Sequence, residues 1–155
     1  MRILIINSEY PPIGGGAGNA CANLGAELAA QGQDVTVLTV RYGDLPEFQE
    51  EKGVHIWRIK SLRRHKERSG AFEQGFFVLS GSLGTLSLLR KWQPDVIIAF
   101  FGVPAGAVTW LTGGLTRIPY LVSLRGGDVP GFRPYDFAFY HRLMAPVLHL
   151  SLIHI

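Results

Sequence analysis

The sequence opens with an apolar strand, residues 2–6, that leads through a glycine-rich loop at residues 14–18 into an Ala- and Leu-rich helix. This order places unpaired backbone N–H groups and the positive end of a helix dipole beside the loop. Such a loop is an anion site, and its expected ligand carries phosphate. The alternative is a glycine-rich turn that only lets the helix pack closely on a sheet.

The spacing of these glycines argues against two common nucleotide-binding motifs. A dinucleotide fingerprint requires Gly-x-Gly-x-x-Gly at the strand end, and here Asn19 stands where the third glycine belongs. The second expected strand is followed by Arg41 rather than by an acidic residue that could hold a ribose. A P-loop is disfavoured because the segment contains no lysine. An NADP-dependent oxidoreductase, with Arg41 reading the 2′-phosphate, stays open as an alternative.

Apolar strands alternate with helical segments along the chain, which indicates an α/β fold: a Rossmann-like parallel sheet with helices on both faces. Strands are expected at residues 2–6, 34–40, 54–59, 95–100 and 120–124, and helices at residues 19–31, 71–92 and 105–115. The second helix reads as a core helix, because large apolar residues recur in it at helical spacing. These residues are Phe72, Phe76, Leu79, Leu83, Leu86 and Leu89.

Two features bear on location. Residues 96–116 contain no charged residue and approach the length of a membrane span, but Gly102 and Pro104 favour a buried strand followed by a helix. The chain starts without the pattern of a signal peptide, and its single cysteine, Cys21, is expected to be buried and unreactive. A cytoplasmic location is therefore expected.

Several segments resemble one enzyme family. Residues 10–15 read Tyr-Pro-Pro-Ile-Gly-Gly, and residues 119–129 read Pro-Tyr-Leu-Val-Ser-Leu-Arg-Gly-Gly-Asp-Val. Together with residues 1–6 and 32–39, and in this order, they resemble the N-terminal half of a family 4 glycosyltransferase. The resemblance implies the GT-B fold, in which two Rossmann-like domains face a cleft. The first domain serves mostly the acceptor and the second mostly the nucleotide sugar.

The resemblance also implies an activity and a set of site residues. The parent enzyme would transfer a sugar from a nucleotide-diphosphate sugar to a glycan or lipid-linked acceptor, with retention of configuration. No metal and no cofactor besides the donor substrate is expected, and the five histidines show no spacing typical of metal ligands. The substrate- or phosphate-binding residues would be Gly14, Gly15, Gly16, Gly18 and Asn19 in the first loop and Arg125, Gly126, Gly127 and Asp128 in the second.

The second loop departs from the family pattern. The family typically has His-Gly-x-Asp, whereas this chain has Arg125 in place of the histidine. Arginine grips phosphate or carboxylate through two N–H groups but cannot accept a hydrogen bond. Asp128 is the candidate catalytic carboxylate; a role in holding Arg125 or capping the turn is favoured, because Asp is common in turns with Gly. Asn19 would cap the first helix or touch the ligand.

Six basic residues crowd into the end of the third expected strand and the loop after it. They are Arg58, Lys60, Arg63, Arg64, Lys66 and Arg68. Such clusters attract anionic surfaces, and the resemblance favours peripheral contact with anionic lipid on the inner face of the membrane. The alternatives are a solvated loop, or a non-catalytic domain that binds membrane through residues 58–68. Nucleic acid is not expected, because no aromatic stacking platform accompanies the cluster.

The expected domain organisation is that of half an enzyme. Residues 1–149 would form one acceptor-side domain. The family's second domain holds the nucleotide sugar with a Glu-x7-Glu-type motif, and nothing after Pro146 supplies one. Residues 150–155 are expected to be a non-native tail, and the fragment alone to be inactive. The alternative is a natural stand-alone domain.

Overall fold

The computed structural model describes residues 1–66, 68–126, 128–129, 142, 144–149 and 151. In this part of the chain, six strands form one sheet in the order β3-β4-β2-β1-β5-β6. The strands are β1 (Arg2–Ile6), β2 (Asp34–Val40), β3 (Phe48–Glu51), β4 (Val54–Ile59), β5 (Val96–Phe100) and β6 (Tyr120–Ser123). All neighbours are parallel except β3, which pairs antiparallel with β4.

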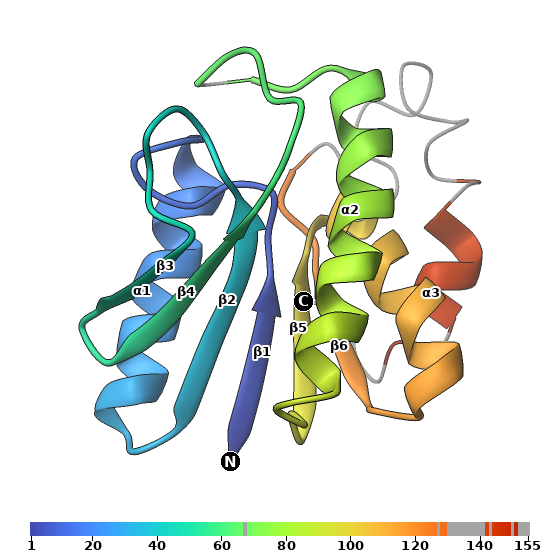
Figure 1. Cartoon of the computed structure of the whole chain (residues 1–155). Coiled ribbons are helices and arrows are strands. Elements are labelled where there is room, and N and C mark those ends of the chain that lie inside the picture. Colours follow the sequence, from blue (N-terminus) through green and yellow to red (C-terminus); the bar gives the residue numbers. More distant parts are fainter. Residues whose placement is uncertain (67, 127, 130–141, 143, 150, 152–155) are drawn as a thin grey trace.

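Helices cover both faces of the sheet. They include α1 (Gly16–Ala30), α2 (Ala71–Leu89) and α3 (Ala107–Thr116), and the irregular turn η1 (Phe101–Gly106) precedes α3; residues 144–149 are also helical. Figure 1 shows α1 on one side of the sheet and α2 and α3 on the other. Successive strand residues point to opposite faces, so Ile5 packs in the core under α1 whereas Leu4 packs in the core under α2 and α3.

The α/β fold class and five of the strands are confirmed at the predicted positions. The strand β3 escaped prediction because its sequence, Phe-Gln-Glu-Glu, has no alternation of apolar and polar residues. It lies at the edge of the sheet and is mostly exposed. The sheet is therefore mixed, with an antiparallel edge strand on an otherwise parallel core.

The helix α1 begins at Gly16, three residues before the expected start. Gly15 occupies the N-cap position, and no described side chain caps the helix. Asn19 lies inside the first turn with its side chain exposed, so its predicted role as a cap is wrong, and contact with a ligand stays a prediction. At the other end Gly32 has φ of +79°, which suits the glycine that commonly follows a helix.

The interpretation of α2 as a core helix is only partly correct. Phe77 and Leu89 are buried, but Phe72, Leu79 and Leu83 are exposed. Small residues face the protein instead. A Cβ atom added at Gly84 would lie 3.0 Å from Ile59 Cγ2, and one at Gly81 would lie 3.0 Å from Val108 Cγ2. These glycines let α2 approach the sheet and α3 closely and leave its larger side chains outside.

Residues 96–116 form β5, η1 and α3, in agreement with the predicted strand and helix. Among the described residues, no helix is both long enough and apolar enough to span a bilayer. Cys21 is fully buried on α1, as expected, and this burial raises the pKa of its thiol to about 12.

Candidate functional site

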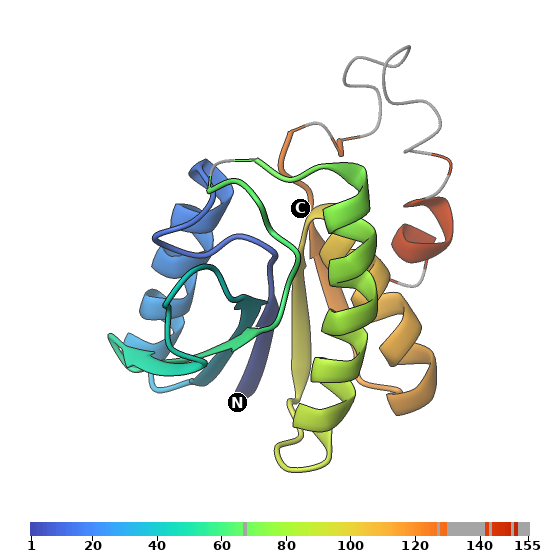
Figure 2. The same cartoon turned by 45° about the horizontal axis from the view of Figure 1, so that its top comes forward.

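Three loops meet at one edge of the sheet. The strands β1, β5 and β6 are parallel neighbours, and their carboxyl ends lead into residues 7–15, into η1 and, among the described residues, into 124–126 and 128–129. In open α/β sheets, ligands bind beyond this edge. Figure 2 turns the edge toward the reader. The two loops singled out in the sequence therefore lie on the same side of the molecule.

The first loop requires glycine at two positions for different reasons. Gly14 has φ of +87°, and a Cβ atom there would lie 2.6 Å from Glu9 Cβ, so only glycine fits. Its N–H donates a hydrogen bond to the carbonyl oxygen of Lys66 at 2.8 Å. Gly18 is buried, and a Cβ atom there would lie 3.1 Å from the carbonyl oxygen of Ile13. Gly18 therefore packs α1 against the loop rather than lining a ligand surface.

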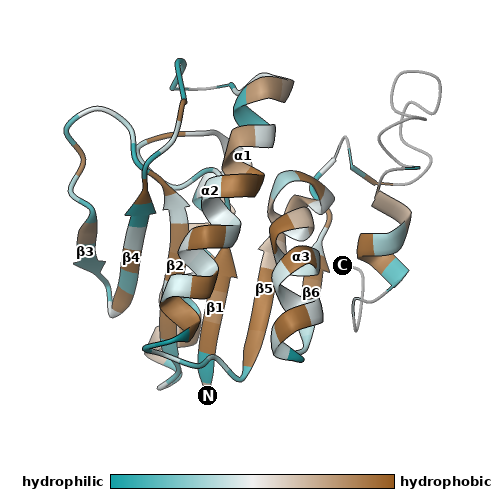
Figure 3. Ribbon diagram, turned by 45° about the vertical axis from the view of Figure 1, so that its right-hand side comes forward, coloured by the Kyte–Doolittle hydropathy of each residue, from teal (hydrophilic) through white to brown (hydrophobic). Residues whose placement is uncertain are grey.

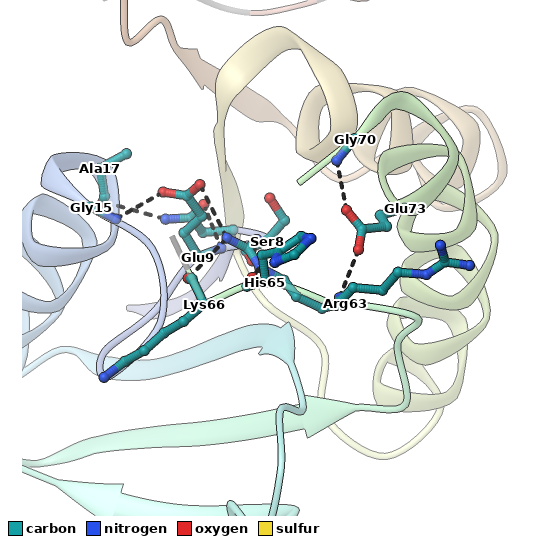
Figure 4. Close-up of polar contacts among 11 residues, drawn as sticks. Ser8, Glu9, Gly15, Ala17, Arg63, His65, Lys66, Gly70 and Glu73 are labelled. Atoms are coloured by element: carbon teal, nitrogen blue, oxygen red, sulfur yellow. Dashed lines mark hydrogen bonds and ion pairs between the residues drawn. The ribbon is translucent and has the colours of Figure 1, made fainter. Parts of the chain in front are cut away.

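A carboxylate of the chain itself lies at the N-terminus of α1. Glu9 Oε2 accepts a hydrogen bond from the Gly15 N–H at 3.3 Å, and Glu9 Oε1 lies 3.7 Å from Arg63 Nη2 (Figure 4). The N–H groups of Gly16 and Ala17 in the first helical turn have no acceptor in the part of the chain that is described. These two amides remain available to an anionic ligand.

Arg63 ties the loop after β4 to the loop after β1. Its side chain is buried, and it donates from Nη1 to the carbonyl oxygen of Ser8 at 3.2 Å. It also donates from Nε to the carbonyl oxygen of His65 at 2.9 Å and from Nη2 to that of Lys66 at 3.3 Å. Figure 4 shows this side chain between the two loops. The Arg63 guanidinium therefore binds backbone carbonyl groups of the site loops and does not contribute to an exposed surface.

Arg58 is also removed from the predicted basic surface. It is buried on β4, and its Nη1 donates to the carbonyl oxygen of Pro46 at 3.4 Å. Desolvation lowers the pKa of this guanidinium below its usual value. The prediction that Arg58 and Arg63 belong to an exposed patch is therefore corrected. The four other members remain exposed: Lys60, Arg64, Lys66 and Arg68.

Asp128 joins the loops that follow β5 and β6. Its carboxylate is buried; Oδ2 accepts a hydrogen bond from the Gly102 N–H at 3.1 Å, and Oδ1 accepts one from the Arg125 N–H at 2.6 Å. Both contacts are with the backbone, which agrees with an organising role and not with a grip on the Arg125 guanidinium. Gly126 has φ of +100° in the turn between them. The predicted site residue Gly127 lies outside the described residues.

Arg125 presents its charge at the same edge. Its guanidinium carbon lies 4.5 Å from the centroid of the Phe100 ring at the end of β5, a distance at which a cation is attracted to the ring face. The residue is exposed, and its guanidinium donates no hydrogen bond to any described residue. Its N–H groups are thus free to bind an anionic group of a ligand.

A family model for the glycosyl transferase 4-like domain matches residues 15–155. The chain belongs to this glycosyltransferase family.

Two curated relatives support the assignment of this glycosyltransferase 4-like chain. The "Putative teichuronic acid biosynthesis glycosyltransferase TuaC" of Bacillus subtilis is 27% identical over 162 residues, which cover 88% of this chain and 39% of that protein. The "Uncharacterized glycosyltransferase MJ1607" of Methanocaldococcus jannaschii is 40% identical over 63 residues, which cover 40% of this chain and 16% of that protein. The chain thus spans well under half the length of these relatives.

Solved structures show the same fold. The sucrose-phosphate synthase of Thermosynechococcus elongatus matches with a TM-score of 0.72 at 16% identity, over 99% of this chain and 41% of that one. The UDP-GlcNAc 2-epimerase of Neisseria meningitidis, solved with UDP-GlcNAc, matches with a TM-score of 0.52 at 11% identity, over 100% of this chain and 39% of that one. The glycosyltransferase 4-like chain therefore has the architecture of one half of a GT-B protein.

Two further predictions from the sequence concern Arg41 and the absence of a metal site. Arg41, the candidate reader of a 2′-phosphate, donates from Nε to the carbonyl oxygen of Leu45 at 3.0 Å. It lines an open hollow of about 800 Å³ beyond β2 and β4, together with Lys60 and Phe76. Within the described ranges, no three His, Cys, Asp or Glu side chains gather as metal ligands would.

Sequence reasoning missed Glu9 and the buried role of Arg63. A carboxylate in the loop between a strand and two prolines carries no distinguishing pattern. The signal for Arg63 was present but ambiguous, because a run of basic residues looks the same whether one member turns inward or none does.

Proposed function

We propose that this glycosyltransferase 4-like chain is the acceptor-side half of an enzyme that transfers a sugar from a nucleotide-diphosphate sugar to a glycan or lipid-linked acceptor. The observation that carries the proposal is that the Arg125 guanidinium and the amides of Gly16 and Ala17 lie beyond the same edge of the sheet and have no hydrogen-bond acceptor among the described residues. A cation and a helix N-terminus together suit a diphosphate. The printed name of TuaC, which refers to teichuronic acid biosynthesis, supports a glycan acceptor.

In the proposed reaction, one residue of the chain stabilises charge and another positions the loop that carries it. Arg125 stabilises negative charge that develops on the departing diphosphate, which lowers the barrier when the donor is preorganised. Asp128 fixes the backbone of that loop against Gly102. In a reaction with retention, the leaving phosphate itself assists the acceptor hydroxyl, so no protein base is required in this proposal. The nucleotide portion would bind to a second domain.

The test uses the protein encoded when the source reading frame is followed beyond codon 149. We expect a second strand–helix repeat with a Glu-x7-Glu motif, and transfer from one member of a panel of radiolabelled nucleotide sugars to a glycan or lipid extract. Arg125→Ala should lower turnover by about tenfold or more, because a charge-assisted hydrogen bond contributes roughly 1.5–3 kcal/mol. Arg90→Ala is the matched control, since Arg90 is exposed after α2, away from this edge. No transfer from any donor would refute the proposal.

A further inference from the structure

The outward side of α2 is a stripe of large apolar side chains. Phe72, Leu79 and Leu83 have exposed fractions of 73%, 66% and 71%, and Phe76 is half-buried beside them. Their spacing places them along one side of the helix, over about 16 Å at 1.5 Å per residue. We call these four residues the α2 stripe. An exposed apolar surface of this extent marks an interaction site.

The two helices around the stripe carry little charge. Glu73 is the one charged residue of α2, and its carboxylate turns back to accept hydrogen bonds from the N–H groups of Gly70 and Arg64. The neighbouring helix α3 has no charged residue and exposes Leu111 and Leu115. Figure 3 shows α2 and α3 side by side in front of the sheet, with hydrophobic colouring along both.

Most hydroxyl groups of these two helices donate a hydrogen bond to the backbone of the preceding turn, whereas Ser87 is exposed near the C-terminal end of α2, beyond the stripe. Ser80 Oγ donates to the carbonyl oxygen of Phe76 at 3.0 Å, and Ser82 Oγ donates to that of Val78 at 2.7 Å. On α3, hydroxyls bond in the same way to the preceding turn, at residues 109, 112 and 116. Protein interfaces carry about one hydrogen bond per 100–200 Å², and this surface offers few groups that could form them. Contact with lipid acyl chains requires no hydrogen bonds.

Basic residues lie at the N-terminal end of the stripe. Arg64 and Arg68 line a hollow of about 520 Å³ together with Phe72, and Lys60 lines another together with Phe76. Lys66 is exposed in the same loop. None of these four cations forms an ion pair with an acidic side chain in the described part of the chain. The surface thus combines an apolar row with a group of positive charges, and Glu73 is the acidic residue that lines the same hollow as Arg64 and Arg68.

We propose that the α2 stripe, with Lys60, Arg64, Lys66 and Arg68, docks the domain on an anionic lipid surface. Leu79 and Leu83 enter the boundary between headgroups and acyl chains, and the cations contact the lipid phosphates. This mode of binding differs from attraction by a basic loop alone, because the apolar side chains make part of it resistant to salt. The proposal is independent of the sugar and acceptor that the enzyme uses.

Insertion can be measured directly because the chain has one cysteine, which is buried. Leu79→Cys therefore provides a single accessible thiol for an environment-sensitive fluorophore such as NBD. With vesicles that contain phosphatidylglycerol, we expect a blue shift and stronger emission from this label. Lys52→Cys is the control, because Lys52 is exposed in the β3–β4 turn, away from the stripe. Its label should stay in water.

Co-sedimentation with the same vesicles tests the apolar and the electrostatic contributions to binding separately. Leu79→Ser with Leu83→Ser should weaken binding by about tenfold or more, since each buried methylene contributes about 0.8 kcal/mol. Arg64→Glu with Arg68→Glu should weaken it by at least about tenfold, at roughly 1 kcal/mol per basic residue. Lys52→Glu, in the β3–β4 turn, should bind like the wild type. Matching circular dichroism and melting curves would verify that the variants fold.

Two results would overturn the proposal. The first is a label at position 79 that stays hydrated in the presence of anionic vesicles. The second is a label that is already shielded without lipid, with self-association in sedimentation equilibrium, because the stripe would then be an interface between protein chains. Equal binding to phosphatidylcholine and phosphatidylglycerol vesicles would contradict the role of the cations.

Discussion

Arg63 and Arg64 are neighbours in the sequence, but the fold gives their side chains opposite environments. Arg63 is enclosed by three backbone carbonyl groups and Glu9, whereas the Arg64 side chain is exposed and its backbone N–H donates to Glu73. A buried guanidinium is stable only when its N–H groups are paired. Arg63 therefore determines how the loops after β1 and β4 sit at the site.

Arg63→Ala should lower the free energy of unfolding by about 2–4 kcal/mol, because it leaves buried carbonyl groups and the Glu9 carboxylate without a donor. Arg64→Ala keeps the backbone contact and should change stability by no more than about 0.5 kcal/mol. Urea unfolding followed by circular dichroism compares the two. Equal losses for both variants would show that the Arg63 network does not hold the loops together.

At this scale the sequence predicted some roles and missed others. Arg125 and Asp128 stand in a recognisable motif, so their place at the sheet edge followed from the parallel pattern of strands. The difference between Arg63 and its neighbours depends on carbonyl groups brought together by the fold, which no local pattern encodes. Gly18 was predicted to contact the ligand, because a glycine needed for packing and a glycine that lets a ligand approach look identical in the sequence.

At the scale of elements, α2 shows how small residues decide the orientation of a helix. The apolar residues predicted to form its core face lie partly outside, because Gly81 and Gly84 allow the opposite side to approach α3 and the sheet. Periodicity identified the helix correctly but could not choose which side faces the core, since nearly every position is apolar or small. The strand β3 was missed for the opposite reason, because it is polar and short.

Alanine substitutions should reveal this close packing. Gly84→Ala is expected to destabilise the fold by about 1–3 kcal/mol, because its Cβ would press on Ile59 in a packed core. Gly75→Ala meets no atom within 4 Å and should stabilise α2 by up to about 1 kcal/mol through helix propensity. Thermal melting of the two variants measures the contrast. Stabilisation of similar size by both would mean that α2 does not approach β4 so closely.

The start of α2 gives a prediction in acid. Hydrogen bonds from the N–H groups of Gly70 and Arg64 lower the pKa of the Glu73 carboxyl below its ordinary value. A lowered pKa in the folded state adds stability above the unfolded value of about 4.3, and this stability is lost as pH falls through the folded value. Glu73→Gln should therefore melt below the wild type at neutral pH. The difference in melting temperature between the variant and the wild type should narrow below about pH 4. A difference that does not depend on pH would exclude ionisation of Glu73 as its cause.

At the scale of the whole molecule, one sheet separates two cores and gathers the site loops at its carboxyl edge. This arrangement was predictable because buried parallel strands are continuous apolar runs, and because their order along the chain fixes the edge where loops meet. The core under α1 contains two groups that ionise in alkali, Tyr10 and Cys21. Their burial links the stability of the entire fold to pH.

Burial raises the pKa of the Cys21 thiol from 9.0 to about 12 and that of the Tyr10 hydroxyl from 10.0 to about 12. A pKa that is raised in the folded state favours folding below the unfolded value, and the benefit is lost as pH rises toward the folded value. The contribution of these two groups to the free energy of unfolding should therefore be constant up to about pH 9 and then decline, by up to about 1.4 kcal/mol per pH unit for each group. Urea midpoints measured across this range give the slope. In Cys21→Ala the decline should begin about one pH unit later, where Tyr10 contributes together with Tyr120, whose pKa is also raised by burial. In Tyr10→Phe the decline should begin at the wild-type pH but be shallower. Parallel curves for the wild type and Cys21→Ala would show that the thiol ionises equally well in the folded protein, and hence that α1 does not seal this core.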